Sequence, residues 1–234
     1  TASLAQWMSK KGRYVVSVNL DPGVVWLPYN PDVDIRNYVS IEKLMEDYEL
    51  GPNGALIMAS DIIADQIFNL NREIEELNPE YILVDTAGQM ELFAFRVSGQ
   101  FIVKELKMEN KMILYIFDAP FSSNPFNYVS NMFLSAAVFL RFMLPQLNVL
   151  SKIDLIPQKT VRQILEWSST PNALRSAFNL QPNGEMYLLT KDIFNTVSRL
   201  RIDFSLVACS AKNFENFVNL DASIQRILTR GEET

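Results

Sequence analysis

The sequence predicts an α/β fold, a doubly wound and mostly parallel sheet with helices on both faces. Short apolar runs bounded by polar or turn residues are typical of strands that are covered on both faces. Longer segments with apolar residues at spacings of three and four separate these runs and are typical of helices. Because strands and helices alternate, we expect parallel strands joined by right-handed crossovers.

The apolar runs define five expected strands, at residues 13–19, 81–84, 112–117, 147–150 and 201–209. The helical spacing predicts long helices at residues 41–49, 55–77, 91–107, 127–144 and 214–228. Residues 1–8 form a further helical stretch, and residues 156–200 are expected to form a helical insertion. Since no internal repeat or flexible linker is found, we expect one domain over residues 1–234.

Composition excludes several kinds of chemistry. The 234 residues contain no histidine, which excludes a Ser-His-Asp triad or a His-ligated metal within them. Cys209 is the only cysteine, so an internal disulfide is impossible and a reducing, cytoplasmic setting is favoured. A net charge of -6 argues against direct nucleic-acid binding. The most apolar stretch, 132–144, is shorter than the roughly 20 residues of a bilayer span, so no membrane partner is expected.

Polar motifs follow four of the five expected strands, where ligands bind in sheets of this kind. They are Asn19-Leu20-Asp21-Pro22-Gly23, Asp85-Thr86-Ala87-Gly88-Gln89-Met90-Glu91, Ser151-Lys152-Ile153-Asp154 and Ser210-Ala211-Lys212. A bare D-x-x-G or K-x-D pattern arises about once by chance in a chain of this length. Their order and their placement at strand ends, however, are those of nucleoside-triphosphate switches.

The chemistry of each position fits that interpretation. Asp85 could hold Mg²⁺ through water, and the N–H of Gly88 could approach a γ-phosphate because glycine lets the chain come close. The alkyl stem of Lys152 could lie over a base. Asp154 could accept hydrogen bonds from N1–H and N2–H₂ of guanine, whereas adenine presents an acceptor at N1.

A phosphate-binding loop of the form G-x-x-x-x-G-K-[ST] is not found among the eight glycines. Residues 1–8 have the pattern of a helix already under way, so we expect the sequence to begin just after that loop. No lysine of the sequence is assigned the phosphate role. The reading frame upstream of Thr1 tests this expectation, since it should hold a glycine-rich loop ending in GK[ST].

Gly51-Pro52-Asn53 forms a second distinctive motif. Taken alone, the tripeptide is typical of a turn, and Asn53 is a candidate N-cap for the helix that follows.

Together these residues resemble those of GPN-loop GTPases of the archaeal–eukaryotic type. The resemblance rests on VNLDPG at 18–23, GPNG at 51–54, DTAGQME at 85–91, LSKIDL at 150–155 and CSAK at 209–212, and spans essentially the whole chain. It implies the P-loop NTPase fold and a homodimer that hydrolyses GTP to GDP and phosphate with Mg²⁺. Such a protein would act as a nucleotide-dependent switch or assembly factor.

The resemblance also implies residue roles. Gly51, Pro52 and Asn53 would reach into the site of the other subunit, where Asn53 contacts phosphate or the attacking water. Asp21, Gln89 and Glu91 would surround that water, with Asp85 on the magnesium side and Gly88 at the phosphate. The guanine-binding set would be Ser151, Lys152, Asp154, Ser210, Ala211 and Lys212. Ser151 stands where many GTPases have Asn or Thr, which would loosen guanine selectivity by the loss of an amide contact.

The expected helix at 127–144 is rich in Phe and Met. The resemblance implies that this region rearranges with nucleotide state and offers an apolar surface to a protein client. The alternative is a core helix of the domain. Phe133, Phe139 and Phe142 do not share one helix face, so we expect at least one of them to point away from the sheet.

Two further functions stay open at this point. One is a nucleotide-binding scaffold or assembly chaperone with little turnover, and the other is an ATP-driven relative of the same fold. The Asn53→Ala variant distinguishes an enzyme from the scaffold, because in an enzyme it should abolish turnover without weakening GTP binding. Asp154 argues against the second, and competition between ATP and labelled GTP tests it.

Overall fold

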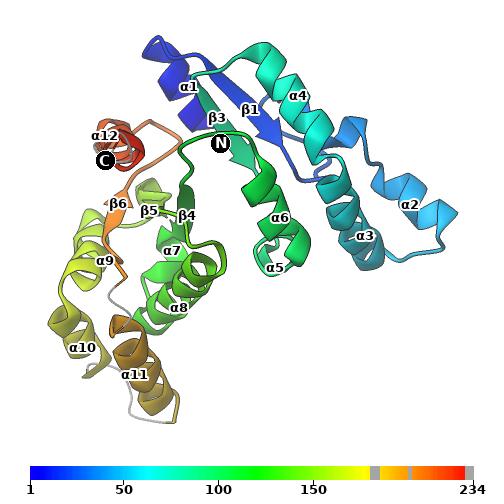
Figure 1. Ribbon diagram of the computed structural model, residues 1–234. Helices are drawn as coiled ribbons and strands as arrows, with labels where there is room; N and C mark the ends of the chain where they lie inside the picture. The colour runs from blue at the N-terminus through cyan, green and yellow to red at the C-terminus, as the bar shows by residue number, and fades with distance from the viewer. Residues whose placement is uncertain (180–184, 200–201, 230–234) are drawn as a thin grey trace. The chain divides into compact units, whose positions relative to one another are not determined.

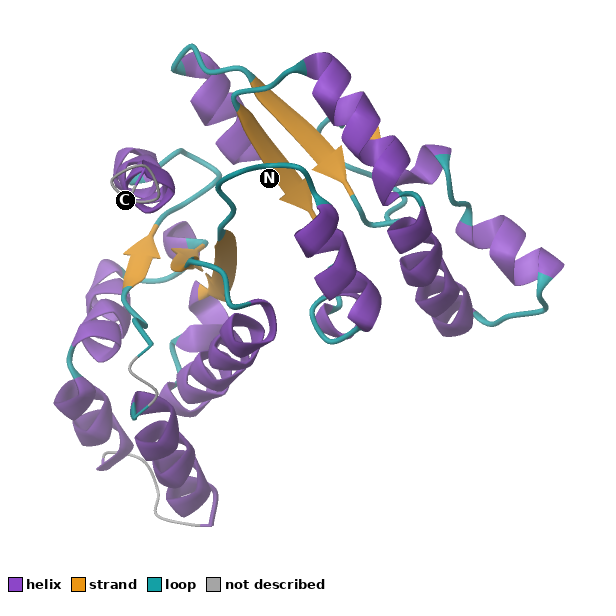
Figure 2. Ribbon diagram, in the orientation of Figure 1, coloured by secondary structure: helices purple, strands orange, loops and turns teal. Residues whose placement is uncertain are grey.

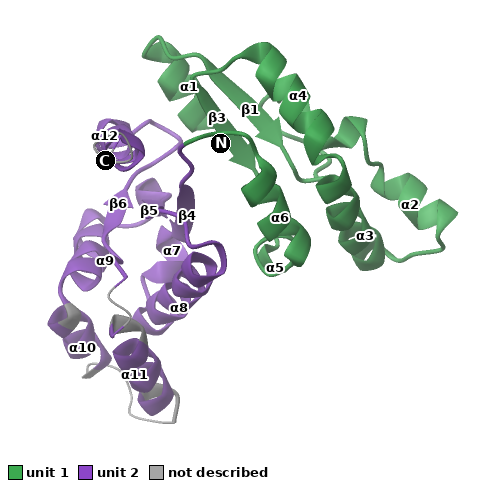
Figure 3. Ribbon diagram, in the orientation of Figure 1, with its two compact units in different colours: residues 1–109 green, residues 110–234 purple. Residues whose placement is uncertain are grey.

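The computed structural model describes residues 1–179, 185–199 and 202–229. The chain divides into two compact units, residues 1–109 and 110–234 (Figure 3). In the described residues each unit contains one three-stranded sheet, and every strand pair within it is parallel. The predicted α/β class with parallel strands is therefore confirmed. The expectation of one domain over 1–234, with an insertion at 156–200, stays a prediction.

Unit 1 has helices before, between and after the strands of its sheet (Figures 1 and 2). Its elements are α1 (Ala2–Lys10), β1 (Val15–Asn19), β2 (Val33–Asp34), the 3-10 turn η1 (Ile35–Asn37), α2 (Ile41–Asp47), α3 (Pro52–Asp65), α4 (Ile67–Leu77), β3 (Tyr81–Asp85), α5 (Met90–Phe93) and α6 (Val97–Glu105). The strand order is β2-β1-β3. Asn19 pairs with Asp34 of β2 and with Asp85 of β3, so three polar residues lie side by side at the carboxyl edge.

The core of unit 1 lies between the central strand and the helices that cover it. Val16 and Val18 are buried on one face of β1, and Ser17 and Asn19 are buried on the other, as expected for a strand covered on both faces. The helices contribute a buried stripe, whose members are Ala55, Ala59, Ile63, Ile67, Leu70 and Ile74. This stripe is the one that the spacing over 55–77 predicted.

The predicted helix at 55–77 is two helices rather than one. α3 ends and α4 begins at Gln66, whose side chain accepts a hydrogen bond of 2.8 Å from Asn69 Nδ2. The buried residues before this break are spaced by four, and each such step rotates the stripe by roughly 40° around a helix of 3.6 residues per turn. At the junction Gln66 has ψ -4°, well away from the α-helical value of about -42°, so the regular helix is interrupted there.

Two further elements of unit 1 differ from the predictions. The expected helix at 91–107 is also divided, into α5 and α6, and the two helices approach each other closely. A Cβ on Gly99 of α6 would lie 1.9 Å from the carbonyl oxygen of Phe93 in α5. Strand β2 was not predicted, since its two residues are too few to show a pattern.

Unit 2 contains the remaining strands and the apolar helix (Figure 1). Its elements are β4 (Ile113–Asp118), α7 (Ala119–Ser122), α8 (Pro125–Phe142), β5 (Gln146–Ser151), the 3-10 turn η2 (Ile153–Leu155), α9 (Gln158–Ser169), α10 (Pro171–Asn179), α11 (Glu185–Ser198), β6 (Leu206–Ala208) and α12 (Phe217–Thr229). The order is β4-β5-β6, and Asp118 pairs with Ser151 at the carboxyl edge. The strand predicted at 201–209 is shorter, and residue 201 lies outside the described residues.

Aromatic side chains join α8 to the sheet and to the helices that follow β5. The ring of Tyr128 in α8 lies 5.8 Å from that of Phe117 in β4 and 5.7 Å from that of Trp167 in α9. Phe178 of α10 stacks on Phe126 of α8 at 5.8 Å. One face of α8 is therefore a core face of unit 2. None of the helices in the described part of the chain has both the length and the apolar character needed to cross a bilayer.

Candidate functional site

The carboxyl edge of the unit 1 sheet is organised by the buried amide of Asn19. Its Nδ2 donates to Asp34 Oδ1 at 2.9 Å and to the main-chain oxygen of Asp21 at 3.2 Å. Its Oδ1 accepts from the N–H of Asp21 at 3.0 Å. The Asp21 carboxylate in turn accepts from the N–H of Gly23 at 3.0 Å. The predicted catalytic Asp21 thus sits in a fixed turn directly after β1.

Asp85, the predicted magnesium residue, ends β3 beside this turn. Its main-chain oxygen accepts a hydrogen bond of 2.7 Å from the N–H of Leu20, and its Oδ2 accepts one of 2.8 Å from the hydroxyl of Tyr29. Burial, followed by the hydrogen bond to Asp85, raises the pKa of Tyr29 far above its ordinary value. The phenol therefore remains a proton donor to Asp85 at every physiological pH.

An arginine fixes the loop that connects these residues. Arg36 forms an ion pair with Asp34, with Nη2–Oδ2 at 2.6 Å, and donates from Nη1 to the main-chain oxygen of Val24 at 3.1 Å. Although burial opposes the charged carboxylate, the hydrogen bonds from Arg36 and Asn19 lower the pKa of Asp34. The hydrogen bond to Asp34 raises the pKa of Arg36. Both groups are consequently charged.

The loop after β3 carries the other predicted residues of the phosphate side. Gly88 is exposed, and a Cβ built on it would meet no atom within 4 Å. Gln89 is the N-cap of α5, and Glu91 lies in its first turn. Both side chains are exposed, so they are accessible to a ligand at this edge.

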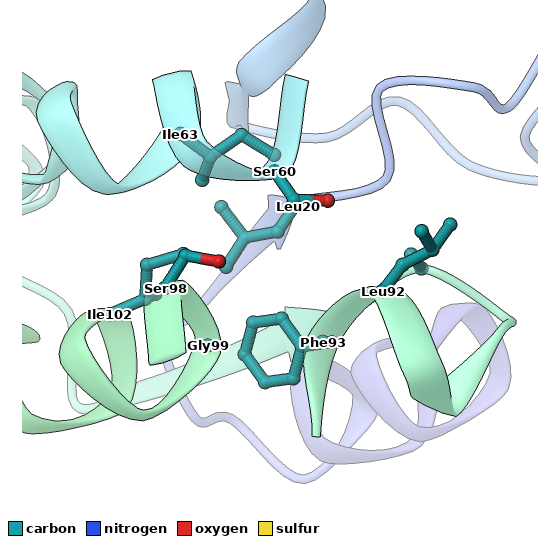
Figure 4. A pocket seen from close by; sticks show the side chains of 9 residues that line it. Leu20, Ser60, Ile63, Leu92, Phe93, Ser98, Gly99 and Ile102 are labelled. Atoms are coloured by element: carbon teal, nitrogen blue, oxygen red, sulfur yellow. The ribbon is translucent and has the colours of Figure 1, made fainter. Parts of the chain in front are cut away.

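A small cavity lies next to this loop and has room for about one water molecule. Figure 4 shows Leu20, Ser60, Ile63, Leu92, Phe93, Ser98, Gly99 and Ile102 around it. Its free space is only about 10 Å³, roughly one water. The cavity is therefore part of the packing between α3, α5 and α6 and is too small for a nucleotide.

The tripeptide Gly51-Pro52-Asn53 begins α3. Gly51 is the N-cap and Pro52 the first helical residue, where its fixed φ suits the helix and its missing N–H is no loss. The expectation that Asn53 is the N-cap is therefore wrong, because the proline one position earlier already begins the helix. All three residues are exposed, and the Asn53 side chain has no hydrogen-bond partner among the described residues.

In unit 2 the predicted guanine residues follow β5. Ser151 is the last residue of β5, and Lys152 adopts a left-handed conformation with φ 63°. Lys152 Nζ lies 2.5 Å from Asp118 Oδ2, at the end of the neighbouring strand β4. This hydrogen bond lowers the pKa of Asp118 even though burial opposes the shift.

The loop after β6 meets this turn through Ser210. The Ser210 hydroxyl is buried, donates to Asp154 Oδ1 at 2.5 Å and accepts from the N–H of Lys212 at 3.3 Å. The N–H of Cys209 donates to the main-chain oxygen of Leu150 at 2.9 Å, which holds the two loops together. Ala211 and Lys212 are exposed. The residues predicted to bind guanine therefore lie together, from Ser151 to Asp154 and from Ser210 to Lys212.

Three contributors were missed by the sequence analysis. Asp118 follows an apolar run, and the rule applied to the other strand ends would have found it. Tyr29 and Arg36 lie in an irregular segment without periodicity, and only their hydrogen bonds to Asp85 and Asp34 identify them.

The apolar helix α8 also has an exposed side. Phe133 is 53% exposed and Leu140 is 54% exposed, whereas Phe139 and Phe142 are half-buried. The expectation that at least one phenylalanine points away from the sheet is therefore confirmed. Because the opposite face packs in the core, the helix has both a structural and an accessible side.

These parallel sheets, with polar clusters at the carboxyl ends of their strands, fit the α/β fold of the P-loop NTPase class. The crystal structure of a GTPase in apo form from Pyrococcus abyssi matches with a TM-score of 0.82 and 25% identity, covering 97% of this chain and 90% of that one. A family model described as "Conserved hypothetical ATP binding protein" matches residues 1–230.

Curated relatives define the family more closely. GPN-loop GTPase 3 of Eremothecium gossypii is 30% identical over 237 residues, covering 98% of this chain and 86% of that protein. GPN-loop GTPase 2 of Schizosaccharomyces pombe is 31% identical over 229 residues, covering 96% and 71%. The chain belongs to the GPN-loop GTPase family.

Proposed function

We propose that the protein hydrolyses GTP to GDP and phosphate with Mg²⁺ and acts as a nucleotide-dependent switch or assembly factor. The observation that carries the proposal is the pair formed by Asp154 and Ser210. A carboxylate accepts hydrogen bonds from N1–H and N2–H₂ of guanine, and adenine lacks both donors on that edge. The Ser210 hydroxyl fixes this carboxylate, and Lys152 supplies an alkyl stem to cover the base.

The carboxyl edge of unit 1 supports binding of the phosphates and the cation. In the described residues no three acidic, cysteine or histidine side chains group as a metal site. Magnesium does not need such a cage, because it keeps several waters and takes one or two carboxylates together with substrate phosphates. Asp85 fits this chemistry through water, and Gly88 is exposed, with an N–H that bonds to no described residue and so is available to a phosphate. Bound magnesium would neutralise charge that develops on the phosphates.

We assign the positioning of the attacking water to Asp21, Gln89 and Glu91, together with Asn53 from a second copy of the chain. No strong base is needed, because orientation and electrostatics dominate phosphoryl transfer. The exposed start of α3 supports the assignment of Asn53. Its side chain has no partner among the described residues, so it is available to another subunit.

The exposed side of α8 supports a role in binding a protein client, with Phe133 and Leu140 as the contact residues. The buried cysteine Cys209, the only one in the chain, supports a reducing compartment such as the cytoplasm.

The test is the rate of GTP hydrolysis by the full-length protein, measured with Mg²⁺ as the protein concentration is raised. A specific activity that increases and then saturates is expected if a second copy completes the site. A specific activity that is independent of concentration fits either a constitutive dimer or a site complete within one chain. The Asn53→Ala variant then distinguishes the two, because only a dimer uses Asn53 of the second copy. No turnover at any concentration would contradict the enzyme and leave a nucleotide-binding scaffold.

A further inference from the structure

The segment between β1 and β2 is attached to the sheet at several points. At its start, Asp21 is hydrogen-bonded to Asn19. At its end, Asp32 Oδ2 accepts from the N–H of Ser17 at 2.7 Å and from its hydroxyl at 2.8 Å. Between these points the side chains of Val25 and Trp26 are exposed, Trp26 to 75%.

Tyr29 connects this segment to Asp85, which lies 56 residues further along the chain. The hydroxyl hydrogen bond occupies Oδ2 of Asp85, while Oδ1 takes no hydrogen bond from any described residue. A carboxylate with one oxygen engaged is restricted in rotation about its terminal bond, and its second oxygen keeps a fixed direction.

We propose that Tyr29 is a positioning residue for Asp85. The Tyr29 hydroxyl orients the Asp85 carboxylate so that Oδ1 accepts a hydrogen bond from a magnesium-bound water. The inference rests on the proposed function, because it takes Asp85 to be the magnesium-side residue. Asp85 would itself be an outer-shell partner of the metal, and groups that hold such a partner in place strengthen metal binding by fixing the geometry before the metal arrives.

The tyrosine also joins the two predicted catalytic regions of unit 1. Asp21 begins the segment that contains Tyr29, and Asp85 precedes the loop that contains Gly88 and Gln89. The hydroxyl therefore couples the direction of the Asp85 carboxylate to the position of the Asp21 segment.

The experiment compares wild type with Tyr29→Phe, which removes the hydroxyl and keeps the ring. The matched control is Tyr14→Phe, because Tyr14 is 48% exposed and precedes the amino end of β1, away from the carboxyl edge. Binding of Mn²⁺ to the GDP-saturated full-length protein is measured by the electron paramagnetic resonance signal of the free ion. Binding of fluorescent GDP without metal is measured in parallel, and thermal unfolding checks the fold.

Loss of the hydrogen bond between Tyr29 and Asp85 in Tyr29→Phe should raise the Kd for Mn²⁺ by about five-fold. The Kd for GDP without metal should not change, and Tyr14→Phe should match wild type. For hydrolysis, kcat should fall at limiting Mg²⁺ and recover at saturating Mg²⁺, with KM for GTP unchanged. A purely structural role would lower the unfolding temperature without this dependence on the metal.

A Kd for Mn²⁺ that is unchanged or lower in Tyr29→Phe, in a wild type that binds GDP and Mn²⁺, would overturn the inference and leave the proposed function intact. If wild type itself binds neither guanine nucleotide nor Mn²⁺ with nucleotide, the proposed function fails and the inference fails with it.

Discussion

The hydroxyl of Ser210 lies 2.5 Å from Oδ1 of Asp154, although 56 residues separate the two in the chain. Parallel strands β5 and β6 are neighbours, so the loops after them meet at the same edge of the sheet. The serine is buried and the carboxylate exposed, an arrangement that fixes an acceptor at the surface. The Asp154 carboxylate therefore has a fixed orientation before any base is bound.

Loss of the Ser210 hydroxyl is expected to weaken guanine binding. Ser210→Ala removes a hydrogen bond worth about 1 to 1.5 kcal/mol, so the Kd for GTP should rise about ten-fold. Fluorescent GTP titration measures this change. Ser223→Ala is the matched control, because its hydroxyl bonds only to a helix carbonyl, that of Asn219. An unchanged Kd in Ser210→Ala would show that the bond to Asp154 does not orient the carboxylate.

Asn53→Ala is expected to abolish most GTP turnover while leaving the affinity for GTP unchanged. Asn53 is exposed at the start of α3, and its amide is proposed to act in the site of a second copy. Single-turnover hydrolysis and nucleotide titration measure the two effects separately. The exposed residue Asn219, changed to alanine, serves as the control. Full turnover in Asn53→Ala would remove the residue from the catalytic set.

The pair formed by Lys152 and Asp118 predicts a weak pH dependence of stability. The folded pKa of Asp118 is lowered, chiefly by the hydrogen bond from Lys152, so the pair stabilises the fold above the ordinary carboxyl pKa of 3.8. This contribution should be lost as the pH falls below that value and through the lower pKa of the folded state, where the carboxylate becomes protonated. Both side chains are more than a third exposed, so it should not exceed about 1 kcal/mol.

Urea unfolding of wild type and Lys152→Met from pH 7 to about pH 3 measures this contribution. The free energies of unfolding should differ at pH 7 and converge at the acid end. A difference that grows as the pH falls would contradict the assignment.

The same substitution is expected to have different effects at two glycines. Gly99→Ala should lower the free energy of unfolding by about 3 kcal/mol, because its Cβ would lie 1.9 Å from the Phe93 carbonyl oxygen. Gly88→Ala should stay within about 1 kcal/mol of wild type, since its Cβ would meet nothing, and yet slow GTP hydrolysis. Chemical denaturation and a phosphate-release assay measure the two effects. Equal losses of stability in both variants would contradict the difference in packing around Gly99 and Gly88.

Much of the architecture was predictable from local patterns. The strands β1, β3, β4 and β5 are short, mostly apolar runs, and their positions follow from composition and from the polar or turn residues that bound them. The breaks within the helices were not predictable, because they depend on tertiary packing. No local pattern marks Gln66 as the end of α3, and Gly99 permits a close approach to Phe93 that only the folded structure reveals.

The candidate site was predictable where its residues stand at strand ends. Asp21, Asp85 and Asp154 were found because each follows a strand or its turn. Tyr29 and Arg36 were not found, because they come from a segment without periodicity and act through hydrogen bonds across the chain. Such contacts depend on the folded path of the loop, which no local pattern encodes.

The most direct test of the account is the nucleotide preference of Asp154→Asn. Guanine presents donors at N1 and N2, whereas xanthine presents a donor at N1 and an acceptor at C2, which an amide can meet and a carboxylate repels. Competition of GTP, ATP and xanthosine triphosphate against a labelled nucleotide should show that wild type prefers GTP and that the variant prefers xanthosine triphosphate. ATP that displaces labelled GTP from wild type at equal concentration, or a variant that keeps its preference for GTP, would contradict the assignment of Asp154 as the residue that recognises guanine.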